Sequence, residues 1–369
     1  MEDLLQKLKP TLLMGPGPSC VPDAVYAALA KPTIGHLDPY FVTIMDAIKE
    51  QLREVFHTKN RLTMPMSGTG SAGMETCFVN LVEHGDKVLV LTNGVFGKRM
   101  QDVAGRLGAQ VDALEIPWGE PVLPEQVREK LAGGKYDIVS IVHAETSTGV
   151  CSPVEAIGKL VREHGALYIV DCVTSLGGIP VDIDAWQADA VYSGTQKCLS
   201  CPPGLSPISF SERAMGKLKA RKTKVPNWYL DLSLIASYWE GTTRTYHHTA
   251  PVNMEYALYA ALREILKEGQ ENVFARHQAA HKQLVEGLAG LGMDMLVAPE
   301  YRLPMLNAVK IPAGVDEAAI RARLLKEHDI EIGSGLGPLA GKIWRIGVMG
   351  HTARPENVRR LLDTLKKVL

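Results

Sequence analysis

Lys197 and Asp171 have the residue types and the surroundings that an aldehyde cofactor requires. Lys197 ends the run 192–197 (YSGTQK), and Asp171 ends the apolar run 166–171 (ALYIVD). A lysine behind small polar residues can form a Schiff base with an aldehyde, and a carboxylate at the carboxyl end of a buried strand can keep a pyridine nitrogen protonated. Pyridoxal 5′-phosphate needs both partners, because its electron-sink chemistry depends on an imine and a charged ring. The pair therefore predicts this cofactor.

Each residue taken alone has a simpler interpretation. Asp171 could serve a metal or the structure, and Lys197 could be a surface lysine after a turn. Their joint occurrence favours the cofactor, with Lys197 first as the imine partner and then as the general base and acid that moves the substrate α-proton.

A phosphate site is predicted at residues 66–73 (MSGTGSAG), which follow an apolar run and open a helix near Ala72. Small residues let backbone N–H groups approach a phosphate, and the hydroxyls of Thr69 and Ser71 can add donors at the positive end of the helix. A plain glycine turn with a serine cap would look the same. Residues 68–73 also satisfy G-x-G-x-x-G, but a dinucleotide site needs an acid at the tip of the next strand. That strand ends in VLTNG (90–94), so the dinucleotide interpretation fails.

Phe96 and Arg345 are candidates for contacting the cofactor ring and the substrate. Phe96 comes just after a predicted strand, where its ring could stack on a flat cofactor or simply join the core. Arg345 lies within an apolar strand, WRIG (344–347). Its guanidinium could bind a substrate carboxylate through two parallel hydrogen bonds, or it could form an internal salt bridge with an Asp or Glu.

We expect no metal site. His247 and His248 are adjacent, so they point in different directions, and no further ligand sits at a suitable spacing. Cys198 and Cys201 form a single C-x-x-C without a second pair. These two cysteines and Cys172 are expected to be small buried residues.

The elements that must position these residues follow from the hydrophobic pattern. Strands are expected at 86–91, 110–116, 137–142 and 166–171, with helices at 96–107 and 154–164. This alternation predicts an α/β fold with a mostly parallel sheet flanked by helices. Ligands of such sheets bind beyond the carboxyl ends of the strands, which is where Asp171, Thr146 and Lys197 fall.

Three regions are expected along the chain. Residues 1–20 form an N-terminal arm that ends in GPGP (15–18), residues 21–265 form a large cofactor-binding domain, and residues 266–369 form a smaller C-terminal α+β domain. Helices are expected at 253–267 and 272–291, and short strands at 306–311 and 343–347.

The composition narrows the class of protein. With 369 residues, 46% of them hydrophobic, and a net charge of −1, the chain suits a soluble globular protein and does not suggest a nucleic-acid partner. No apolar run approaches the length of a membrane span, and the N-terminus lacks the pattern of a secretion signal. The six scattered cysteines fit a reducing compartment, so a cytoplasmic location is expected.

Together these motifs resemble the class V, fold-type I pyridoxal-phosphate-dependent aminotransferases, in the alanine–glyoxylate and serine–pyruvate branch. The resemblance spans nearly the whole chain, and its motifs occur in the family's order. They are LMGPGPS (13–19), SGTGS (67–71), ETSTGV (145–150), DCVTSLGG (171–178), SGTQK (193–197), YHHTAP (246–251) and WRIG (344–347).

The resemblance implies a role for each matching residue. Lys197 matches the Schiff-base lysine, Asp171 the partner of the pyridine nitrogen, and Arg345 the arginine that binds the substrate carboxylate. Gly17 belongs to a pocket suited to a small acceptor. Other matches are Thr69, Gly70 and Ser71 to the phosphate loop, Thr146 and Gln196 to groups near the phenolic oxygen, Val173 to the ring face opposite Phe96, and Tyr246 and Thr249 to residues that reach the phosphate from the neighbouring subunit.

The implied activity is a ping-pong transfer of an amino group from alanine or serine to glyoxylate, in a homodimer with shared active sites. Animal members of the family carry Trp at the position of Phe96 and His at that of Ser71. Residues 34–39 and Asn253 fall where relatives differ in substrate, so (S)-ureidoglycine is an alternative donor.

Two further functions fit the sequence less well. A lyase resembling a cysteine desulfurase would need a mobile catalytic cysteine, and Cys198 and Cys201 follow Lys197 too closely for that. A non-catalytic scaffold is disfavoured because Lys197, Asp171 and Arg345 are all present.

Overall fold

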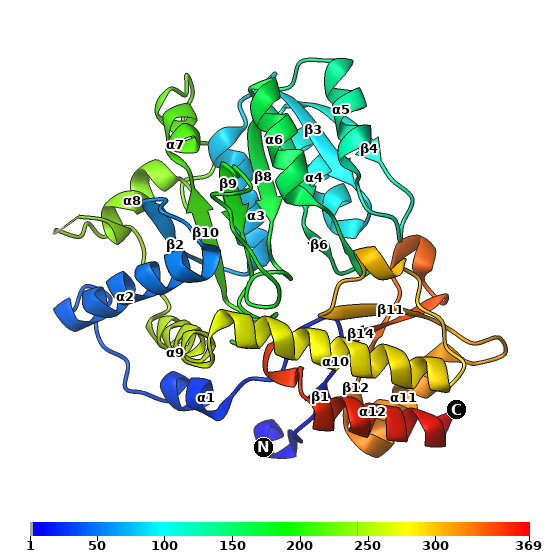
Figure 1. Cartoon of the computed structure of the whole chain (residues 1–369). Helices are drawn as coiled ribbons and strands as arrows, with labels where there is room; N and C mark the ends of the chain where they lie inside the picture. The colour runs from blue at the N-terminus through cyan, green and yellow to red at the C-terminus, as the bar shows by residue number, and fades with distance from the viewer. Residues whose placement is uncertain (1–2, 242) are drawn as a thin grey trace.

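A seven-stranded sheet forms the centre of the computed structural model, which describes residues 3–241 and 243–369 (Figure 1). The strand order is β2-β10-β9-β8-β5-β3-β4; β10 is antiparallel to both of its neighbours, and the other neighbouring pairs are parallel. The predicted α/β fold with a mostly parallel sheet is therefore confirmed. The strands are β2 (Leu62–Ser67), β3 (Lys87–Thr92), β4 (Gln110–Glu115), β5 (Ile138–Val142), β8 (Leu167–Asp171), β9 (Ala190–Tyr192) and β10 (Leu205–Phe210).

Helices cover both faces of this sheet, and the central strands are buried on both sides. In β3, Val88 and Val90 join the core that contains residues of α3 and α4, whereas Leu89 and Leu91 join the core that contains residues of α2, α6 and α9. Such continuous apolar strands are typical of parallel sheets between two helical layers. The helices of this region are α1 (Asp23–Leu29), α2 (Pro39–Phe56), α3 (Gly70–Leu81), α4 (Val95–Arg106), α5 (Pro124–Ala132), α6 (Val154–His164), α7 (Glu212–Lys219), α8 (Leu232–Trp239) and α9 (Val252–Glu268).

The C-terminal part builds a separate antiparallel sheet, in the order β11-β14-β13, with its own core. The N-terminal arm joins this part, because β1 (Leu12–Leu13) pairs in parallel with β12 (Ile330–Glu331). The remaining elements are β11 (Leu306–Lys310), β13 (Gly333–Ser334), β14 (Ile343–Gly347), α10 (Gln270–Gly290), α11 (Glu317–His328), α12 (Pro355–Val368), the hairpin of β6 (Ala144–Glu145) and β7 (Val150–Cys151), and the 3₁₀ turns η1 (Leu4–Lys7), η2 (Pro299–Tyr301), η3 (Gly337–Leu339) and η4 (Gly350–Thr352).

The predicted boundary between the large and the small domain falls within a helix and not in a loop. The boundary after residue 265 lies in the last turn of α9, which runs to Glu268 before α10 begins at Gln270. Residues 1 and 2 of the predicted arm lie outside the described residues. The division into domains stays a prediction.

The predicted helices and strands agree with the structure within two residues at each end. α3 begins at Gly70, two residues before the position predicted from the small residues of the loop. Thr69 is its N-cap residue, because the carbonyl of Thr69 accepts hydrogen bonds from the N–H groups of Ala72 and Gly73. Among the described helices, none combines the length and the apolar composition needed to cross a membrane.

Candidate active site

A cavity of about 230 Å³ opens at the carboxyl ends of β8 and β9. Eight of its eleven lining residues are among the predicted site residues, although they come from four separate segments of the sequence. The lining consists of Thr69, Gly70, Ser71, Met74, Phe96, Arg99, Asp171, Val173, Tyr192, Gln196 and Lys197.

Asp171 is the last residue of β8 and lies opposite Tyr192 in the sheet register. Its Oδ1 accepts a hydrogen bond of 2.8 Å from the N–H of Val173. Burial raises the pKa of Asp171 to about 7, although the hydrogen-bonding groups around it and the charge of Lys197 act in the opposite direction. A positive group placed against this carboxylate would favour its ionised form.

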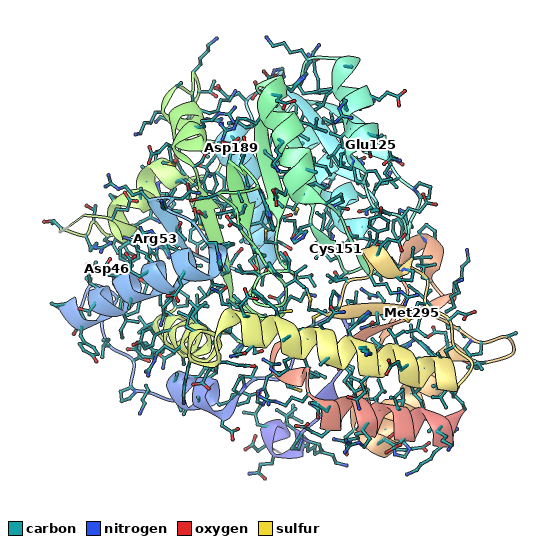
Figure 2. All side chains as sticks on the ribbon, in the orientation of Figure 1. Asp46, Arg53, Glu125, Cys151, Asp189 and Met295 are labelled. Atoms are coloured by element: carbon teal, nitrogen blue, oxygen red, sulfur yellow. The ribbon has the colours of Figure 1, made fainter. Side chains whose placement is uncertain are left out.

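A second buried aspartate shows what a structural carboxylate looks like in this fold. Asp189, labelled in Figure 2, precedes the first residue of β9, whereas Asp171 is the last residue of the parallel strand β8, so the two lie at opposite ends of the strands. It accepts a hydrogen bond from Arg213 at 2.9 Å, one from the hydroxyl of Ser211 and one from the N–H of Tyr168. Asp171 lacks such a cation within ion-pair distance among the described residues, and it faces a cavity.

Lys197 is buried, with 8% of its surface exposed. Its Nζ donates a hydrogen bond to the carbonyl of Pro16, and its own carbonyl accepts one of 2.7 Å from the hydroxyl of Ser19. Burial lowers the pKa of Lys197 to about 8, and the charge of Arg345 lowers it further. Roughly a tenth of the amine is therefore unprotonated at pH 7, and about half at pH 8, in the form that a nucleophile requires.

The predicted phosphate loop forms one wall of the cavity. Thr69, Gly70 and Ser71 lie at the start of α3, where the first N–H groups of a helix have no partner within the helix. The hydroxyls of Thr69 and Ser71 are exposed and have no hydrogen-bond partner in the described part of the chain. These groups can hold an anion at the positive end of α3.

Phe96 lies in the first turn of α4, and its position depends on Glu145. The Oε2 of Glu145 accepts the N–H of Phe96 at 3.1 Å, and the Oε1 accepts the hydroxyl of Ser147 at 2.6 Å. Ser147 in turn accepts the N–H of Val95 at 3.0 Å. Glu145 is fully buried, which raises its pKa. The guanidinium carbon of Arg99 lies 4.8 Å from the centre of the Phe96 ring, a cation–π contact at the cavity wall.

Arg345, in the middle of β14, has no carboxylate partner. Its Nε donates to the carbonyl of Ser334 at 2.7 Å and its Nη1 to the carbonyl of Thr146 at 3.4 Å. Among the described residues, no Asp or Glu oxygen lies within 4.0 Å of it, so the internal salt bridge that the sequence left open is absent. Burial lowers the pKa of Arg345 to about 10, and the charge of Glu145 acts in the opposite direction.

Several predicted residues lie outside the cavity lining. Gly17 lies next to the side chain of Lys197, and Thr146 is buried and meets Arg345 through its carbonyl. Tyr246 is 57% exposed, and its hydroxyl lies 3.5 Å from that of Thr249, which is also exposed. Within one chain, neither of these two residues reaches the cavity.

Asn253 and His36, which the resemblance connected with the choice of substrate, have defined surroundings. The Nδ2 of Asn253 donates to the carbonyls of Leu29 and Lys31, at 2.9 and 2.7 Å, so this side chain anchors the end of α1. The ring of His36 lies 5.1 Å from that of Tyr246, centre to centre.

The cavity fits pyridoxal phosphate in an unsatisfied polar group. The Oε1 of Gln196 is buried and has no hydrogen-bond partner in the part of the chain described. An unpaired buried polar group costs about 1–3 kcal/mol, so a ligand that satisfies this oxygen is stabilised. With a lysine, a strand-end carboxylate and an anion site in one cavity, the residues suit a flat phosphorylated aldehyde.

Sequence reasoning missed four residues that shape the site: Met74, Arg99, Tyr192 and Glu145. Arg99 follows Phe96 by one helical turn, so it could have been found from the predicted helix at 96–107. Tyr192 ends β9, a strand that was not predicted. Glu145 gave no such signal, because its contact with Phe96 joins segments 49 residues apart.

Cysteines and metal ligands play no part in the described geometry. All six cysteines are free, and Cys172, Cys198 and Cys201 are buried, as expected. Within residues 3–241 and 243–369, no three His, Cys, Asp or Glu side chains come together in a group that could hold a metal ion.

Proteins of similar sequence and similar structure are known. The sequence model of the family described as aminotransferase class-V matches residues 23–355. The chain is 40% identical to (S)-ureidoglycine–glyoxylate transaminase of Bacillus subtilis (97% of this chain and 90% of that protein), and 41% identical to alanine–glyoxylate aminotransferase of Mus musculus (97% and 87%). The crystal structure of alanine–glyoxylate aminotransferase from Nostoc sp. superposes with a TM-score of 0.96 at 49% identity and covers 100% of this chain and 99% of its own.

Proposed function

This chain belongs to the class-V aminotransferase family, and on that premise we propose that it moves the amino group of alanine or serine to glyoxylate, forming glycine and a 2-oxo acid. Enzymes of this family depend on pyridoxal phosphate. One observation carries the proposal: Lys197 and Asp171 line the same buried cavity as the start of α3 and Phe96.

We assign the cofactor contacts as follows. The carboxylate of Asp171 would hold the pyridine nitrogen, the first turn of α3 with Thr69 and Ser71 would hold the phosphate, and Phe96 and Val173 would confine the ring. Gln196 and Thr146 would serve the phenolic oxygen. When bound, the cofactor supplies an aldehyde that forms imines with amines and a ring that withdraws electrons from the substrate α-carbon.

Lys197 has the proton-transfer role. Its amine, with a pKa of about 8, can act as a general base that takes the proton from the substrate α-carbon, and then as a general acid that donates the proton to a different atom. Lys197 is only 8% exposed, which limits the contact of its amine with bulk water. The carbonyl of Pro16 gives the amine a resting position when it is not engaged with the cofactor.

Arg345 is proposed to bind the substrate carboxylate. The guanidinium has five N–H donors, and the two hydrogen bonds observed use Nε and Nη1, so donors of Nη2 remain for a carboxylate. Gly17 lies against the side chain of Lys197, and the lack of a side chain at Gly17 suits small substrates such as glyoxylate.

The amino donor has two candidates. The mouse and Nostoc relatives are alanine–glyoxylate aminotransferases, whereas the Bacillus subtilis relative of similar identity is an (S)-ureidoglycine–glyoxylate transaminase. The names of all three relatives include glyoxylate. We therefore propose glyoxylate as the acceptor, whichever donor is used.

We further propose a homodimer in which Tyr246 and Thr249 complete the phosphate site of the neighbouring subunit. The exposure of both residues in the single chain supports this, as does the exposure of Trp228 (63%) near them, stacked on His247 at 4.4 Å. Tyr246→Ala should weaken cofactor binding, and analytical ultracentrifugation of the wild type should give a dimer. The free cysteines support a cytoplasmic location, which cell fractionation would test.

A half-reaction screen tests the proposed function. The purified protein, loaded with pyridoxal phosphate, is mixed with single amino acids without acceptor, and loss of the visible absorbance is followed. Bleaching by alanine or serine, reversed by glyoxylate, supports the main proposal, and bleaching by ureidoglycine alone supports the alternative. Sulfide release from cysteine would point to a lyase, and failure to bind the cofactor would point to a non-catalytic scaffold.

A further inference from the structure

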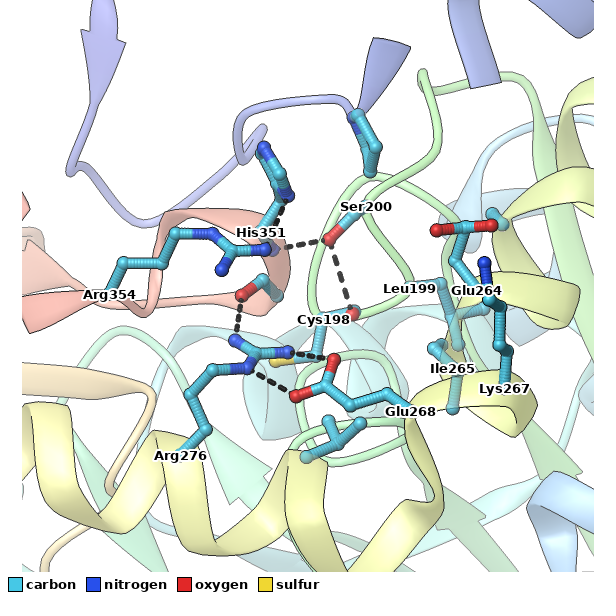
Figure 3. Close-up of a pocket in the computed structure, with 14 residues that line it drawn as sticks. Cys198, Leu199, Ser200, Glu264, Ile265, Lys267, Glu268, Arg276, His351 and Arg354 are labelled. Atoms are coloured by element: carbon cyan, nitrogen blue, oxygen red, sulfur yellow. Dashed lines mark hydrogen bonds and ion pairs between the residues drawn. The ribbon is translucent and has the colours of Figure 1, made fainter. Parts of the chain in front are cut away.

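Behind Lys197, the chain turns through residues 198–200 and meets the turn that follows β14. Ser200 has a φ of +55°, in the left-handed region that non-glycine residues rarely adopt. Its Oγ accepts the N–H of His351 at 2.7 Å and approaches the carbonyl of Cys198 at 3.5 Å (Figure 3). The loop that carries Lys197 therefore touches the segment that continues from the strand of Arg345.

Gly350 forms the other side of this contact, and no larger residue fits there. A Cβ on Gly350 would overlap the Oγ of Ser200 and lie 2.8 Å from the carbonyl oxygen of Cys198. The φ of Gly350 is +53°. Both features require glycine, so the two turns approach as closely as backbone allows.

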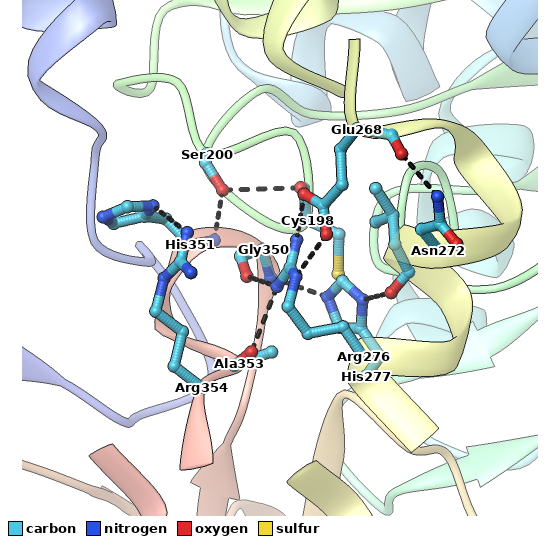
Figure 4. Close-up of polar contacts among 11 residues, drawn as sticks. Cys198, Ser200, Glu268, Asn272, Arg276, His277, Gly350, His351, Ala353 and Arg354 are labelled. Carbon is cyan, nitrogen blue, oxygen red and sulfur yellow. Dashed lines mark hydrogen bonds and ion pairs between the residues drawn. The ribbon is translucent and has the colours of Figure 1, made fainter. Parts of the chain in front are cut away.

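Two consecutive residues of α10 hold both backbone polar groups of Gly350. The Nε2 of His277 accepts its N–H at 2.8 Å, and Nη1 of Arg276 donates to its carbonyl at 2.7 Å (Figure 4). The Nδ1 of His277 lies 2.7 Å from the carbonyl of Val273, which fixes the proton on Nδ1 and leaves Nε2 as an acceptor. Burial lowers the pKa of His277 to about 4, so it is neutral when it accepts this bond.

Arg276 also ties this turn to the junction of α9 and α10. Its Nε and Nη2 donate to the two carboxylate oxygens of Glu268, at 2.6 and 2.9 Å. Glu268 ends α9, the helix that packs against α1 and α2 in the large part of the chain. One guanidinium thus connects the turn after β14 to the end of a helix in the other part of the molecule.

The surroundings of this contact are open. A cavity of about 280 Å³ lies beside it and is lined by Ser200, Arg276, Gly350, His351 and Arg354 among others. Close packing therefore does not by itself hold the turn in place, and the hydrogen bonds of Gly350 contribute more to holding it. The charges lining the cavity are partly matched, Arg276 by Glu268, so the cavity itself does not indicate a ligand.

The N-terminal arm adds a second bridge between the same two segments. Ser19 donates from its hydroxyl to the carbonyl of Lys197 at 2.7 Å, and the N–H of Cys20 donates to the hydroxyl of Thr352 at 3.0 Å. Ser19 and Cys20, which are adjacent in the N-terminal arm, thus bind Lys197 and the turn after β14, respectively.

We propose that the Ser200–Gly350 contact, clamped by Arg276 and His277, is a positioning device that sets the place of Arg345 relative to Lys197 and thereby the affinity for the substrate carboxylate. This inference rests on the proposed function, because it takes Lys197 and Arg345 as the groups that act on the substrate. Arg276 and His277 are positioning residues, since neither lines the cofactor cavity.

Gly350→Ala in the full-length protein loaded with cofactor tests the contact. We expect KM for the amino donor to rise about tenfold or more, with kcat and the cofactor Kd changed less than about threefold, since carboxylate binding alone is disturbed. Gly341→Ala is the matched control: its φ of +71° brings similar backbone strain, but nothing lies within 4 Å of the added Cβ. An equal rise in KM for both variants would overturn the proposal.

A second pair of variants keeps the test decisive if Gly350→Ala folds poorly. His277→Gln retains an acceptor for the N–H of Gly350, whereas His277→Leu removes it. KM is expected to rise about fivefold or more in the leucine variant and less than about twofold in the glutamine variant. Similar KM values for the two would show that His277 acts only by filling space.

Hydrogen–deuterium exchange distinguishes failure of this inference from failure of the proposed function, because it needs no turnover. His277→Leu should speed exchange both at residues 349–352 and at residues 197–201, relative to His277→Gln. Faster exchange at 349–352 alone would overturn the coupling, whatever the enzyme does. A wild type that no donor bleaches would overturn the function while leaving this measurement interpretable.

Discussion

Gly17 lies directly against the amine of Lys197: a Cβ on Gly17 would come within 2.7 Å of both Nζ and Cδ of the lysine. The φ of Gly17, +106°, also excludes most other residues. Glycine is therefore required at position 17 for two reasons: the backbone conformation, and the space that the side chain of Lys197 occupies.

Gly17→Ala should therefore reduce activity more than stability. The backbone strain costs about 1–2 kcal/mol of unfolding free energy, while displacement of Lys197 should lower kcat/KM about tenfold or more. Gly292→Ala is the control, because Gly292 has a φ of +75° and open space around its Cα. Kinetics and chemical denaturation of both variants check this. If the two variants are equally active and equally stable, Gly17 is required only for the backbone conformation.

Lys197→Ala should abolish both the visible absorbance of the loaded protein and its turnover. A general acid–base group contributes about 10²–10⁴-fold to a rate, and this lysine also anchors the cofactor, so a loss of at least about 10³-fold is expected. Lys98→Ala, at an exposed lysine that pairs with Glu115, should leave both properties intact. A yellow and active Lys197→Ala protein would contradict the assignment.

Arg345→Ala should raise the donor KM strongly while the cofactor stays bound. A hydrogen bond to a charged group contributes about 1.5–3 kcal/mol, which corresponds to a rise of about 10–150-fold. Arg321→Ala serves as the control, because Arg321 pairs with Glu317 on α11, away from the cofactor cavity. Steady-state kinetics separate the two outcomes, and an unchanged KM would make Arg345 structural.

The parts of the site that sequence could predict are those carried by local patterns. Lys197, Asp171 and the start of α3 each sit beside an element whose type and end are visible in the hydrophobic pattern, and parallel strands bring such ends to one edge. The roles of Gly17, Val173 and Gln196 came only from resemblance to a family.

What sequence could not predict depends on contacts between distant segments. The capping of Phe96 by Glu145 joins β6 to α4, and the clamp on Gly350 joins α10 to the turn after β14. Neither contact has a periodicity or a spacing that could reveal it. The predicted start of α3 was two residues too late. Glycine and serine are poor helix formers, yet Gly70 and Ser71 occupy the first turn of α3.

The charge of Arg345 should set the pH at which the lysine accepts the cofactor. Protonation of Lys197 beside this cation is unfavourable, which helps to lower its pKa to about 8. Arg345→Gln should raise that pKa, so the unprotonated fraction at pH 8 falls and cofactor uptake slows. The rate at which visible absorbance appears in the cofactor-free protein, followed from pH 6.5 to 9.5 (a range of about three units around that pKa), should show a midpoint shifted upward; an unmoved midpoint would contradict the coupling.

Glu145→Gln should move the same midpoint in the opposite direction. The negative charge of Glu145 favours the protonated form of Lys197, so its removal lowers the pKa of the lysine and shifts cofactor uptake to lower pH. Glutamine still offers one acceptor oxygen, so the N–H of Phe96 can remain bonded, whereas Glu145→Ala leaves buried donors unpaired at a cost of about 1–3 kcal/mol. Comparing the two variants separates the charge from the cap. A midpoint shifted only in Glu145→Ala would mean that Glu145 is uncharged in the folded protein and serves α4 alone.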